Sequence, residues 1–458
     1  MRPSPALAAL AVVSALLAAG CADRGGSDSD GAPTAPTVSA ASADFGELKN
    51  VCGPGNPTAA PAQGVTADEV EVGVLTDVGF SKNPEFVDAA KVFTSWCNDA
   101  GGINGRKIVA NIRDTKFMEV RQRVLEACRD DFALVGGGAG LDHLGVRDRV
   151  SCLLPEFPGQ VIKLENEGSD LQFSVQPGGA SYLRNAAFYD WLLKEAYPAS
   201  ASAVGIIVGD SIKSSGEQRI EFLRAWGANV AYSDLYPATG VSNWTPYAQA
   251  IKNKGVKGLI FMGDFRMLAK LEQELTNMDY KLDWIDTNVN AYGHAFVDIT
   301  GSQVLNAQNN MADLSGIHPV EDAAGNPATR QVVDLFAKYA PGAEVSIGAV
   351  KSFSAWLLFA KSASACGDNL TRKCLYEQAR KETAWTGGGL QAPRDMSAQD
   401  SPSQCFNVVK ATPDGWKSVD VKANQGSYRC GVASYKLTGS YGKPVTLADV
   451  GKSVNDLT

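Results

Sequence analysis

Apolar and polar residues alternate in blocks along the chain, and the first blocks predict a β-strand, an α-helix and a second β-strand. The apolar run over 70–75 stops at Asp77, as a strand does where it enters a loop. Apolar residues then recur at helical spacing over 86–97, and the glycine pair at 101–102 predicts the end of that helix. An Asn-Gly turn leads into the next apolar run, 107–113. This is the order of a βαβ unit.

The same alternation continues through the rest of the chain. Further strands are predicted over 132–135, 152–154, 171–176, 203–208, 230–235, 258–262 and 282–285. Further helices are predicted over 121–128, 182–195, 217–226, 244–254 and 267–278. Strands separated by helices of this length form parallel, doubly wound sheets. Because the pattern restarts near residue 180, we expect an α/β fold with two such sheets.

One segment of the opening unit is specific enough to indicate a family. Residues 98–108 read Asn-Asp-Ala-Gly-Gly-Ile-Asn-Gly-Arg-Lys-Ile. This segment, after that strand and helix, resembles the opening of the leucine/isoleucine/valine-binding family of type I periplasmic binding proteins. The resemblance extends over about residues 66–420. It implies a non-enzymatic protein that binds a small molecule, as a monomer and without a cofactor, and delivers it to an ABC permease.

The resemblance also implies a domain organisation. Two doubly wound parallel-sheet lobes are expected, joined by a three-stranded hinge, with lobe I formed by 66–178 plus 311–383 and lobe II by 179–310 plus 384–430. Residues 431–458 form a C-terminal extension. Three consecutive glycines, 387–389, fall near the third hinge crossing, where glycine can absorb changes in φ and ψ.

The N-terminal segment resembles a bacterial lipoprotein leader. Residues 1–20 carry Arg2 and then an apolar run that is too short to cross a bilayer. The run ends in Leu-Ala-Ala-Gly before Cys21, which resembles a lipobox with lipidation at that cysteine. Residues 21–65, rich in Ser, Ala, Pro and Gly, would form a flexible tether. We therefore expect a protein lipid-anchored to the extracytoplasmic face of the cell membrane; the alternative is an ordinary signal peptide with a chance cysteine.

Cysteine content indicates an oxidising compartment. Setting Cys21 aside from the nine cysteines leaves eight, an even number typical of disulfides in exported chains. Cys366 and Cys374 flank a compact helix-turn-helix, and Cys405 and Cys430 flank a hairpin, so these are two expected pairs. The remaining four cysteines form the hypothetical pairs Cys52–Cys97 and Cys128–Cys152. A metal site is the alternative, but no CxxC motif or closely spaced histidines support it.

The candidate ligand contacts lie at strand ends, because doubly wound sheets bind ligands beyond the carboxyl ends of their strands. The candidates are Asp77, Phe80, Gly138, Ala139, Asp142, Phe157, Ser215, Asp264, Phe265 and Asn288. In the family, a lobe I loop with Ser or Thr holds the ligand carboxylate, whereas here residues 137–142 contain neither. The family's acidic and tyrosine positions in lobe II fall on Asn288 and Ser215. These departures favour a small polar metabolite, amino-acid-like or other.

Several candidates have a structural alternative. The glycines at 136–140 could bind an anion through backbone N–H groups or could only allow a tight turn. Asp142 and Asp264 precede predicted helices, so either could be an N-cap. Phe157 and Phe265 could be core residues.

Composition and motifs limit the other function classes. The formal net charge is −8 without a basic stripe, so we do not expect nucleic-acid binding. Residues 206–212 resemble the nucleophile block of GDSL hydrolases, with Ser211 as nucleophile and His318 as base. However, Ser315 stands where the orienting Asp is needed, and no oxyanion block is present. A ligand-sensing lipoprotein without a transporter is the other alternative.

Overall fold

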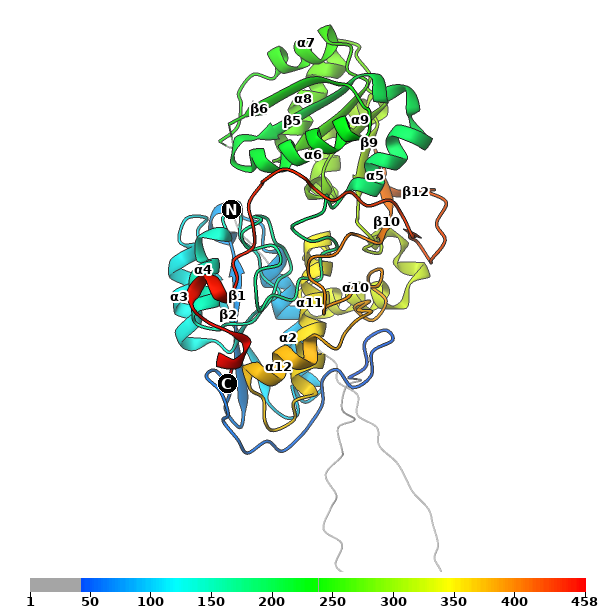
Figure 1. Ribbon diagram of the computed structural model, residues 1–458. Helices are drawn as coiled ribbons and strands as arrows, with labels where there is room; N and C mark the ends of the chain where they lie inside the picture. Colours follow the sequence, from blue (N-terminus) through cyan, green and yellow to red (C-terminus); the bar gives the residue numbers. More distant parts are fainter. Residues whose placement is uncertain (1–42, 238) are drawn as a thin grey trace, which may run out of the picture. The chain divides into compact units, whose positions relative to one another are not determined.

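The computed structural model describes residues 43–237 and 239–458, and this part of the chain contains two parallel-strand sheets (Figure 1). The first sheet has the strand order β2-β1-β3-β4 and all its pairs are parallel. Its strands are β1 (Glu69–Thr76), β2 (Lys107–Asp114), β3 (Ala133–Val135) and β4 (Glu156–Phe157). The doubly wound α/β fold expected from the sequence is confirmed.

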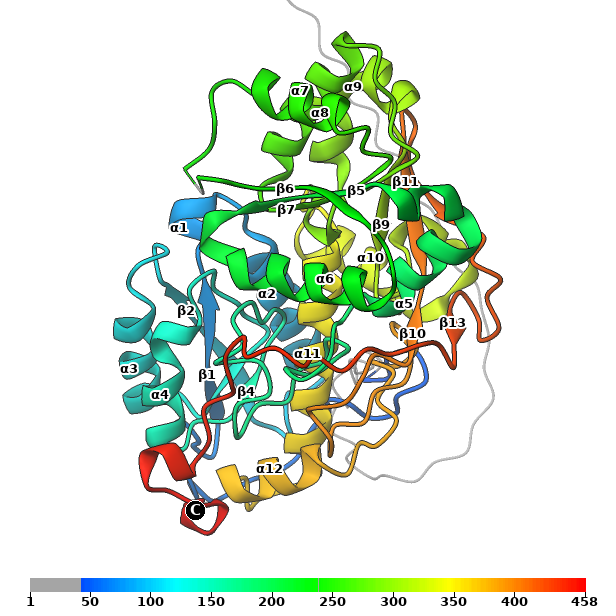
Figure 2. The same ribbon diagram turned by 45° about the horizontal axis from the view of Figure 1, so that its top comes forward.

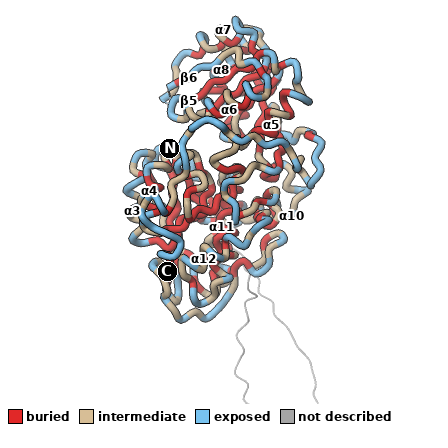
Figure 3. Tube along the Cα trace, in the orientation of Figure 1, coloured by how far each residue is buried: buried red, intermediate tan, exposed pale blue. Residues whose placement is uncertain are grey.

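The helices of the first sheet come from two distant parts of the sequence. They are α1 (Val78–Ser81), α2 (Glu85–Asp99), α3 (Val120–Asp130), α4 (His143–Ser151), α10 (Pro327–Tyr339), α11 (Ile347–Ser364) and α12 (Arg372–Ala379). Helix α11 contacts α2, β3 and β4, and nearly all of its side chains are buried (Figure 3). We call this sheet with these helices lobe I.

The second sheet has seven strands in the order β12-β11-β9-β8-β7-β5-β6. They are β5 (Val204–Gly209), β6 (Val230–Tyr236), β7 (Gly258–Met262), β8 (Trp284–Asp286), β9 (Asn310–Asp313), β11 (Val408–Thr412) and β12 (Gly415–Val419). The pairs that β11 makes with β9 and with β12 are antiparallel, and the other pairs of this sheet are parallel. The helices are α5 (Ala186–Trp191), α6 (Lys213–Ala225), α7 (Thr245–Asn253), α8 (Phe265–Asn277) and α9 (His294–Ala307). We call this assembly lobe II.

Three predicted elements are wrong. The strand predicted over 152–154 is a turn in which Leu153 has φ 58°, and β4 begins only at Glu156. The strand predicted over 171–176 is reduced to one bridge between Gln172 and Glu156. The helix predicted from 182 begins at Ala186, because Tyr182 pairs with Lys436 of the C-terminal segment. In the second and third cases the chain instead forms an isolated bridge with a distant segment.

The ends of two predicted segments also differ from the sequence pattern. Met311, the expected start of the return to lobe I, still lies in β9 of the second sheet. Part of the expected tether, from residue 43 onward, packs on lobe I, since the ring of Phe45 is buried against Trp96 and Phe353. The glycines at 387–389 all have positive φ, which an L side chain rarely adopts. None of the helices in the described residues is long and apolar enough to cross a bilayer.

Disulfides join the eight cysteines of the described chain in four pairs. Cys366–Cys374 closes the turn between α11 and α12, and Cys405–Cys430 joins the short strands β10 (Cys405–Phe406) and β13 (Arg429–Cys430). Cys52–Cys97 fixes the N-terminal segment to α2, and Cys128–Cys152 joins α3 to the end of α4. These are the pairs expected from the sequence; Cys21 lies outside the described residues.

The C-terminal segment, residues 431–458, runs from β13 past α6 to the side of α4 (Figure 2). At the lobe II end, Glu221 of α6 accepts hydrogen bonds from five groups of this segment, including the hydroxyl of Tyr441. At the lobe I end, the backbone N–H of Leu447 donates to Asp170 at 2.6 Å, and the Leu447 side chain is buried. The segment therefore connects the two lobes in addition to the hinge.

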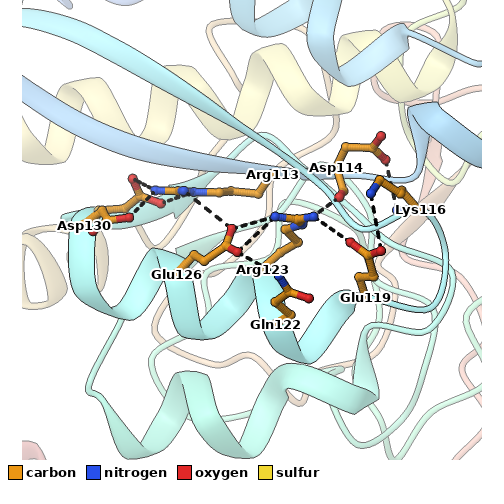
Figure 4. Close-up of polar contacts among 9 residues, drawn as sticks. Arg113, Asp114, Lys116, Glu119, Gln122, Arg123, Glu126 and Asp130 are labelled. Carbon is orange, nitrogen blue, oxygen red and sulfur yellow. Dashed lines mark hydrogen bonds and ion pairs between the residues drawn. The ribbon is translucent and has the colours of Figure 1, made fainter.

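A charged network fixes the carboxyl end of β2 to α3 (Figure 4). Arg113 donates two hydrogen bonds of 2.9 Å to the fully buried carboxylate of Asp131. Arg123, on the outer side, pairs with Glu119 and Glu126 and donates to a backbone carbonyl of β2. The charges of this network are thus paired with one another.

Candidate ligand-binding cavity

A cavity of about 670 Å³ is lined by loops from the carboxyl ends of strands in both lobes. From lobe I, it is lined by the loops after β1, β3 and β4 and by the N-terminal turn of α11. From lobe II, it is lined by the loops after β7 and β8 and the start of α9. This volume is in the range of small-molecule sites.

On the lobe I side, Asp77 holds two loops together rather than presenting a free carboxylate. One carboxylate oxygen accepts from the hydroxyl of Thr115, and the other accepts from the backbone N–H of Gly140 at 2.6 Å. Gly138 lines the cavity where an added Cβ would meet Gln160 at 2.8 Å, so the wall approaches closely there. Phe117 also lines the cavity, and its ring stacks on that of Phe80 at 4.7 Å.

On the lobe II side, Asp264 is the N-cap of α8. Its side chain accepts from the backbone N–H of Arg266 at 2.8 Å, and it also pairs with the guanidinium of that residue. The guanidinium carbon lies 4.9 Å from the centre of the Phe265 ring. Tyr236 accepts a hydrogen bond from the backbone N–H of Asp264, which fixes the end of β7. Arg266 and Phe265 thus present a cation and an aromatic face to the cavity.

Tyr292 of lobe II and Glu344, which precedes α11 of lobe I, also line the cavity. Tyr292 lines the cavity, donates to Glu321 and accepts from the backbone N–H of Val320, so its hydroxyl is held in place. Burial raises the pKa of Tyr292, and the charge of Glu321 raises it further. The carboxylate of Glu344 accepts from the backbone N–H of His294 at 2.9 Å.

The N-terminal turn of α11 brings three polar side chains together. Ser346 is the N-cap of α11 and donates to the carboxylate of Glu85 at 2.5 Å. Burial raises the pKa of Glu85, although hydrogen bonds and the charge of Lys351 oppose the rise. Lys351, one turn further along α11, lines the same cavity and is only 8% exposed.

The sequence-predicted residues divide into two sets. Asp77, Gly138, Asp264 and Phe265 line the cavity. Phe80 is 63% exposed and lies behind Phe117, outside the lining set. Ala139, Asp142, Phe157, Ser215 and Asn288 are also outside it.

Local contacts explain why residues of this second set do not line the cavity. Asp142 is buried and accepts from the backbone N–H groups of Ile162 and Lys163, which fixes the loop after β4. Burial raises the pKa of Asp142 to about 7 against these hydrogen bonds. Phe157 stacks on Phe173 in the core, and the Asn288 side chain accepts from the backbone N–H of Asn290.

Sequence reasoning missed Glu85, Lys351, Arg266 and Tyr292, which all line the cavity. Glu85 and Arg266 directly precede predicted helices, so nothing in the sequence pattern distinguishes them as ligand contacts. Lys351 lies in a segment whose apolar residues indicate a core helix. A lysine inside such a helix was the available indication, because Lys is seldom fully buried unless it is paired.

The residues of the hydrolase alternative are not arranged as a catalytic pair. Ser211 is exposed at the end of β5, and its backbone carbonyl accepts from the ammonium of Lys163 at 2.5 Å. His318 is buried, with Nδ1 2.9 Å from the carbonyl of Pro319. No hydrogen bond between the two side chains exists in the described chain. Among the described residues there is also no group of three or more His, Cys, Asp or Glu side chains that could hold a metal ion.

Comparison with known proteins agrees with this geometry. The family model described as "Periplasmic binding protein" matches residues 201–416. No curated protein matches the sequence.

Solved structures match over most of the chain. A fatty acid ABC transporter substrate-binding protein from Thermomonospora curvata is 16% identical with a TM-score of 0.66, over 82% of this chain and 95% of that one. A leucine-binding protein from Thermotoga maritima is 13% identical with a TM-score of 0.63, over 76% and 97%. A branched-chain amino acid transporter substrate-binding protein from Streptococcus pneumoniae, in complex with isoleucine, is 14% identical with a TM-score of 0.62, over 77% and 99%. The chain therefore has the fold of the type I periplasmic binding proteins, and residues 201–416, just under half of it, match the periplasmic binding protein family model.

Proposed function

We propose that this protein is an extracytoplasmic solute-binding lipoprotein, which captures a small metabolite between its two lobes and delivers it to an ABC importer. The observation that carries the proposal is the cavity of about 670 Å³, because its wall is contributed by strand ends of both lobes. Contacts from both lobes are complete only when the lobes close, so a ligand would shift the hinge equilibrium toward closure.

The cavity supports a ligand with both polar and apolar parts. Aromatic side chains from both lobes line it, including Phe86 and Phe117 from lobe I and Phe265 and Phe296 from lobe II. Charged residues are interspersed among them, as in sites where a few polar groups fix the orientation of a ligand. The T. curvata relative is described as a fatty acid binder, and the S. pneumoniae relative holds isoleucine. An acid with an apolar chain is common to both.

The proposal also includes the location of the protein, at the extracytoplasmic face of the cell membrane. Four disulfides fit an oxidising compartment. The lipobox-like segment ending at Cys21 supports lipidation at that residue. Cys21→Ala is expected to abolish acyl labelling and to move the protein out of the membrane fraction. An intact mass showing an unacylated mature terminus would contradict the anchor.

A thermal-shift screen against a metabolite library tests the binding function. A true ligand at 100 times its Kd stabilises the native state by about 2.7 kcal/mol, which raises the melting temperature measurably. Ala295→Trp fills the cavity from an exposed position on α9, and we expect it to abolish the shift.

Ile299→Trp is the matched control, since Ile299 is exposed on the same helix but outside the lining set. We expect this variant to keep the full ligand-induced shift. A screen without any stabilising compound, or a shift that survives Ala295→Trp, would contradict the proposed function.

A further inference from the structure

Lys351 is a buried cation that has carboxyl groups nearby but no direct hydrogen-bond partner in the described chain. Only 8% of the residue is exposed, and it lines the cavity from the second turn of α11. Its ammonium makes no hydrogen bond and no ion pair with any described residue. Buried charges in proteins are ordinarily paired, because removal of an ion from water costs several kcal/mol. This lysine therefore differs from a solvated surface lysine.

The surroundings keep Lys351 charged at neutral pH in spite of its burial. Burial lowers its pKa to about 8, and the nearby guanidinium of Arg184 lowers it too, whereas the carboxyl groups of Glu85 and Asp313 raise it. A group with this pKa is mainly protonated at pH 7. Those two carboxyl groups have other donors: Ser346 for Glu85, and Asn185 for Asp313.

Three acids of the cavity already accept hydrogen bonds, in contrast to Lys351, whereas a further lining acid, Asp88, is near only the charge of Lys91. Asp77 accepts from Thr115 and Gly140, as described above. Asp264 caps α8 and pairs with Arg266, and Glu344 accepts from a backbone N–H. A ligand ammonium would have to compete with these donors. A ligand anion would instead meet an ammonium with open hydrogen-bonding capacity.

Apolar side chains also line the cavity near α11. Phe86 of α2 and Ile347, in the first turn of α11, both line the cavity and are buried. Phe296, from lobe II, is a buried aromatic residue of the opposite wall. A hydrocarbon body would bury its apolar surface against these side chains, which favours binding.

We propose that Lys351 anchors the acid group of the ligand, and that the ligand class is a monocarboxylate with an apolar body. The N-terminal end of α11 adds a favourable potential for the anion. Ser346 already donates to the Glu85 carboxyl group beside it, and burial raises the pKa of that group. This assignment rests on the proposed solute-binding function.

Titration calorimetry with three acids and their matched amides tests the assignment. The probes are octanoate, phenylacetate and 4-methylpentanoate, each compared with its own carboxamide, and zwitterionic leucine is included. At least one acid is expected to bind, with its amide weaker by about tenfold or more, equivalent to about 1.4 kcal/mol. Lys351→Met should weaken the acid by a similar factor and leave amide binding unchanged.

Two further variants separate anchoring from a structural role. Lys351→Arg keeps the charge and should retain most of the affinity for the acid. Lys91→Met removes an exposed lysine of α2 that lies outside the cavity lining, and should change affinity by less than about threefold. Lys351→Met should fold with an unchanged circular dichroism spectrum, because Met fills a similar volume without a charge.

The possible outcomes distinguish a wrong assignment of Lys351 from a failure of the proposed solute-binding function. If Ala295→Trp blocks a ligand that carries no charge, the assignment of Lys351 as anchor is wrong and the binding function stands. The same holds if a ligand binds to Lys351→Met as tightly as to the wild-type protein. If acids and amides bind equally, the anchor is also overturned. If no compound binds at all, the proposed function fails first.

Discussion

Tyr441 donates a 2.6 Å hydrogen bond to Glu221, and this contact attaches the C-terminal segment to helix α6. The same carboxylate accepts from the hydroxyl of Tyr435 and from backbone N–H groups of Thr438 and Gly439. Burial raises the pKa of Glu221, but these hydrogen bonds more than offset it and bring the pKa to about 2. Several groups of the segment therefore share one charged acceptor.

We predict that Glu221→Gln releases the C-terminal segment from lobe II. Hydrogen bonds to a charged acceptor contribute about 1.5–3 kcal/mol each, so the unfolding free energy should fall by about 1–3 kcal/mol. Amide hydrogen exchange should accelerate over residues 435–441. Because the native-state pKa is lowered, the stabilisation by Glu221 should persist in mild acid and disappear only as the pH falls toward about 2.

Glu217→Gln is the control for this prediction. Glu217 lies on the same helix, but its carboxylate is exposed and pairs only with Lys213. Its loss should change the unfolding free energy by less than about 0.5 kcal/mol. Equal protection over 435–441 in wild type and Glu221→Gln would show that the carboxylate does not hold the segment.

A second prediction concerns Arg113 and the buried Asp131. Arg113→Met would leave a fully buried carboxylate with only Asn111 as a side-chain partner, at 2.7 Å. Removal of one partner from a buried ion pair costs about 3–5 kcal/mol, which urea unfolding would detect. Adding Asp131→Asn to Arg113→Met should recover much of the loss, because the uncompensated charge is then absent.

Arg123→Met provides the matched comparison in the same network (Figure 4). Arg123 pairs with Glu119 and Glu126 nearer the surface, where ion pairs contribute about 0–1 kcal/mol. If Arg113→Met and Arg123→Met lowered the free energy of unfolding by equally small amounts, the buried pair would have no special role in stability.

A third prediction follows from Glu272, a fully buried carboxyl in α8. Burial raises its pKa to about 8, opposed by a hydrogen bond from Asn310 at 2.9 Å. A raised native-state pKa gives stability that is complete below the unfolded pKa and is lost as pH rises through the folded pKa. Wild-type stability should therefore fall between about pH 5 and about pH 8, and Glu272→Gln should fall less. Parallel pH profiles for the two proteins would contradict this assignment.

A fourth prediction compares two phenylalanines at the cavity. Phe265 lines the cavity, and Phe265→Ala should weaken a ligand by about tenfold or more, since it removes apolar contact area. Phe80 was an equal candidate from the sequence, but it lies behind Phe117 and is mostly exposed. Phe80→Ala should weaken the same ligand by less than about threefold in calorimetry. The reverse order of effects would place the ligand outside the cavity.

The difference between these phenylalanines shows what the sequence could predict. The β1–α2–β2 unit was predictable because its strands and helix have local periodicity, and the loops at strand ends followed from the topology. Asp77 and Asp264 could be assigned to the correct loops for the same reason. Their engagement with Gly140 and Arg266 was not predictable, because it depends on three-dimensional distances.

Lys351 and Asp142 mark the limit of sequence reasoning. The cavity position of Lys351 results from α11 packing against α2 and the first sheet, segments far away in the chain. Asp142 follows a strand as a ligand contact would, yet its carboxylate fixes residues 162–166 from within the protein. In both cases the role depends on which polar groups surround the side chain after folding.

A co-crystal structure with a compound from the thermal-shift screen tests the central claim most directly. The account predicts ligand density between the lobes, in contact with Gly138 and Phe86 of lobe I and with Phe265 and Tyr292 of lobe II. Density at another site, or contacts with only one lobe in a closed molecule, would contradict capture between two lobes.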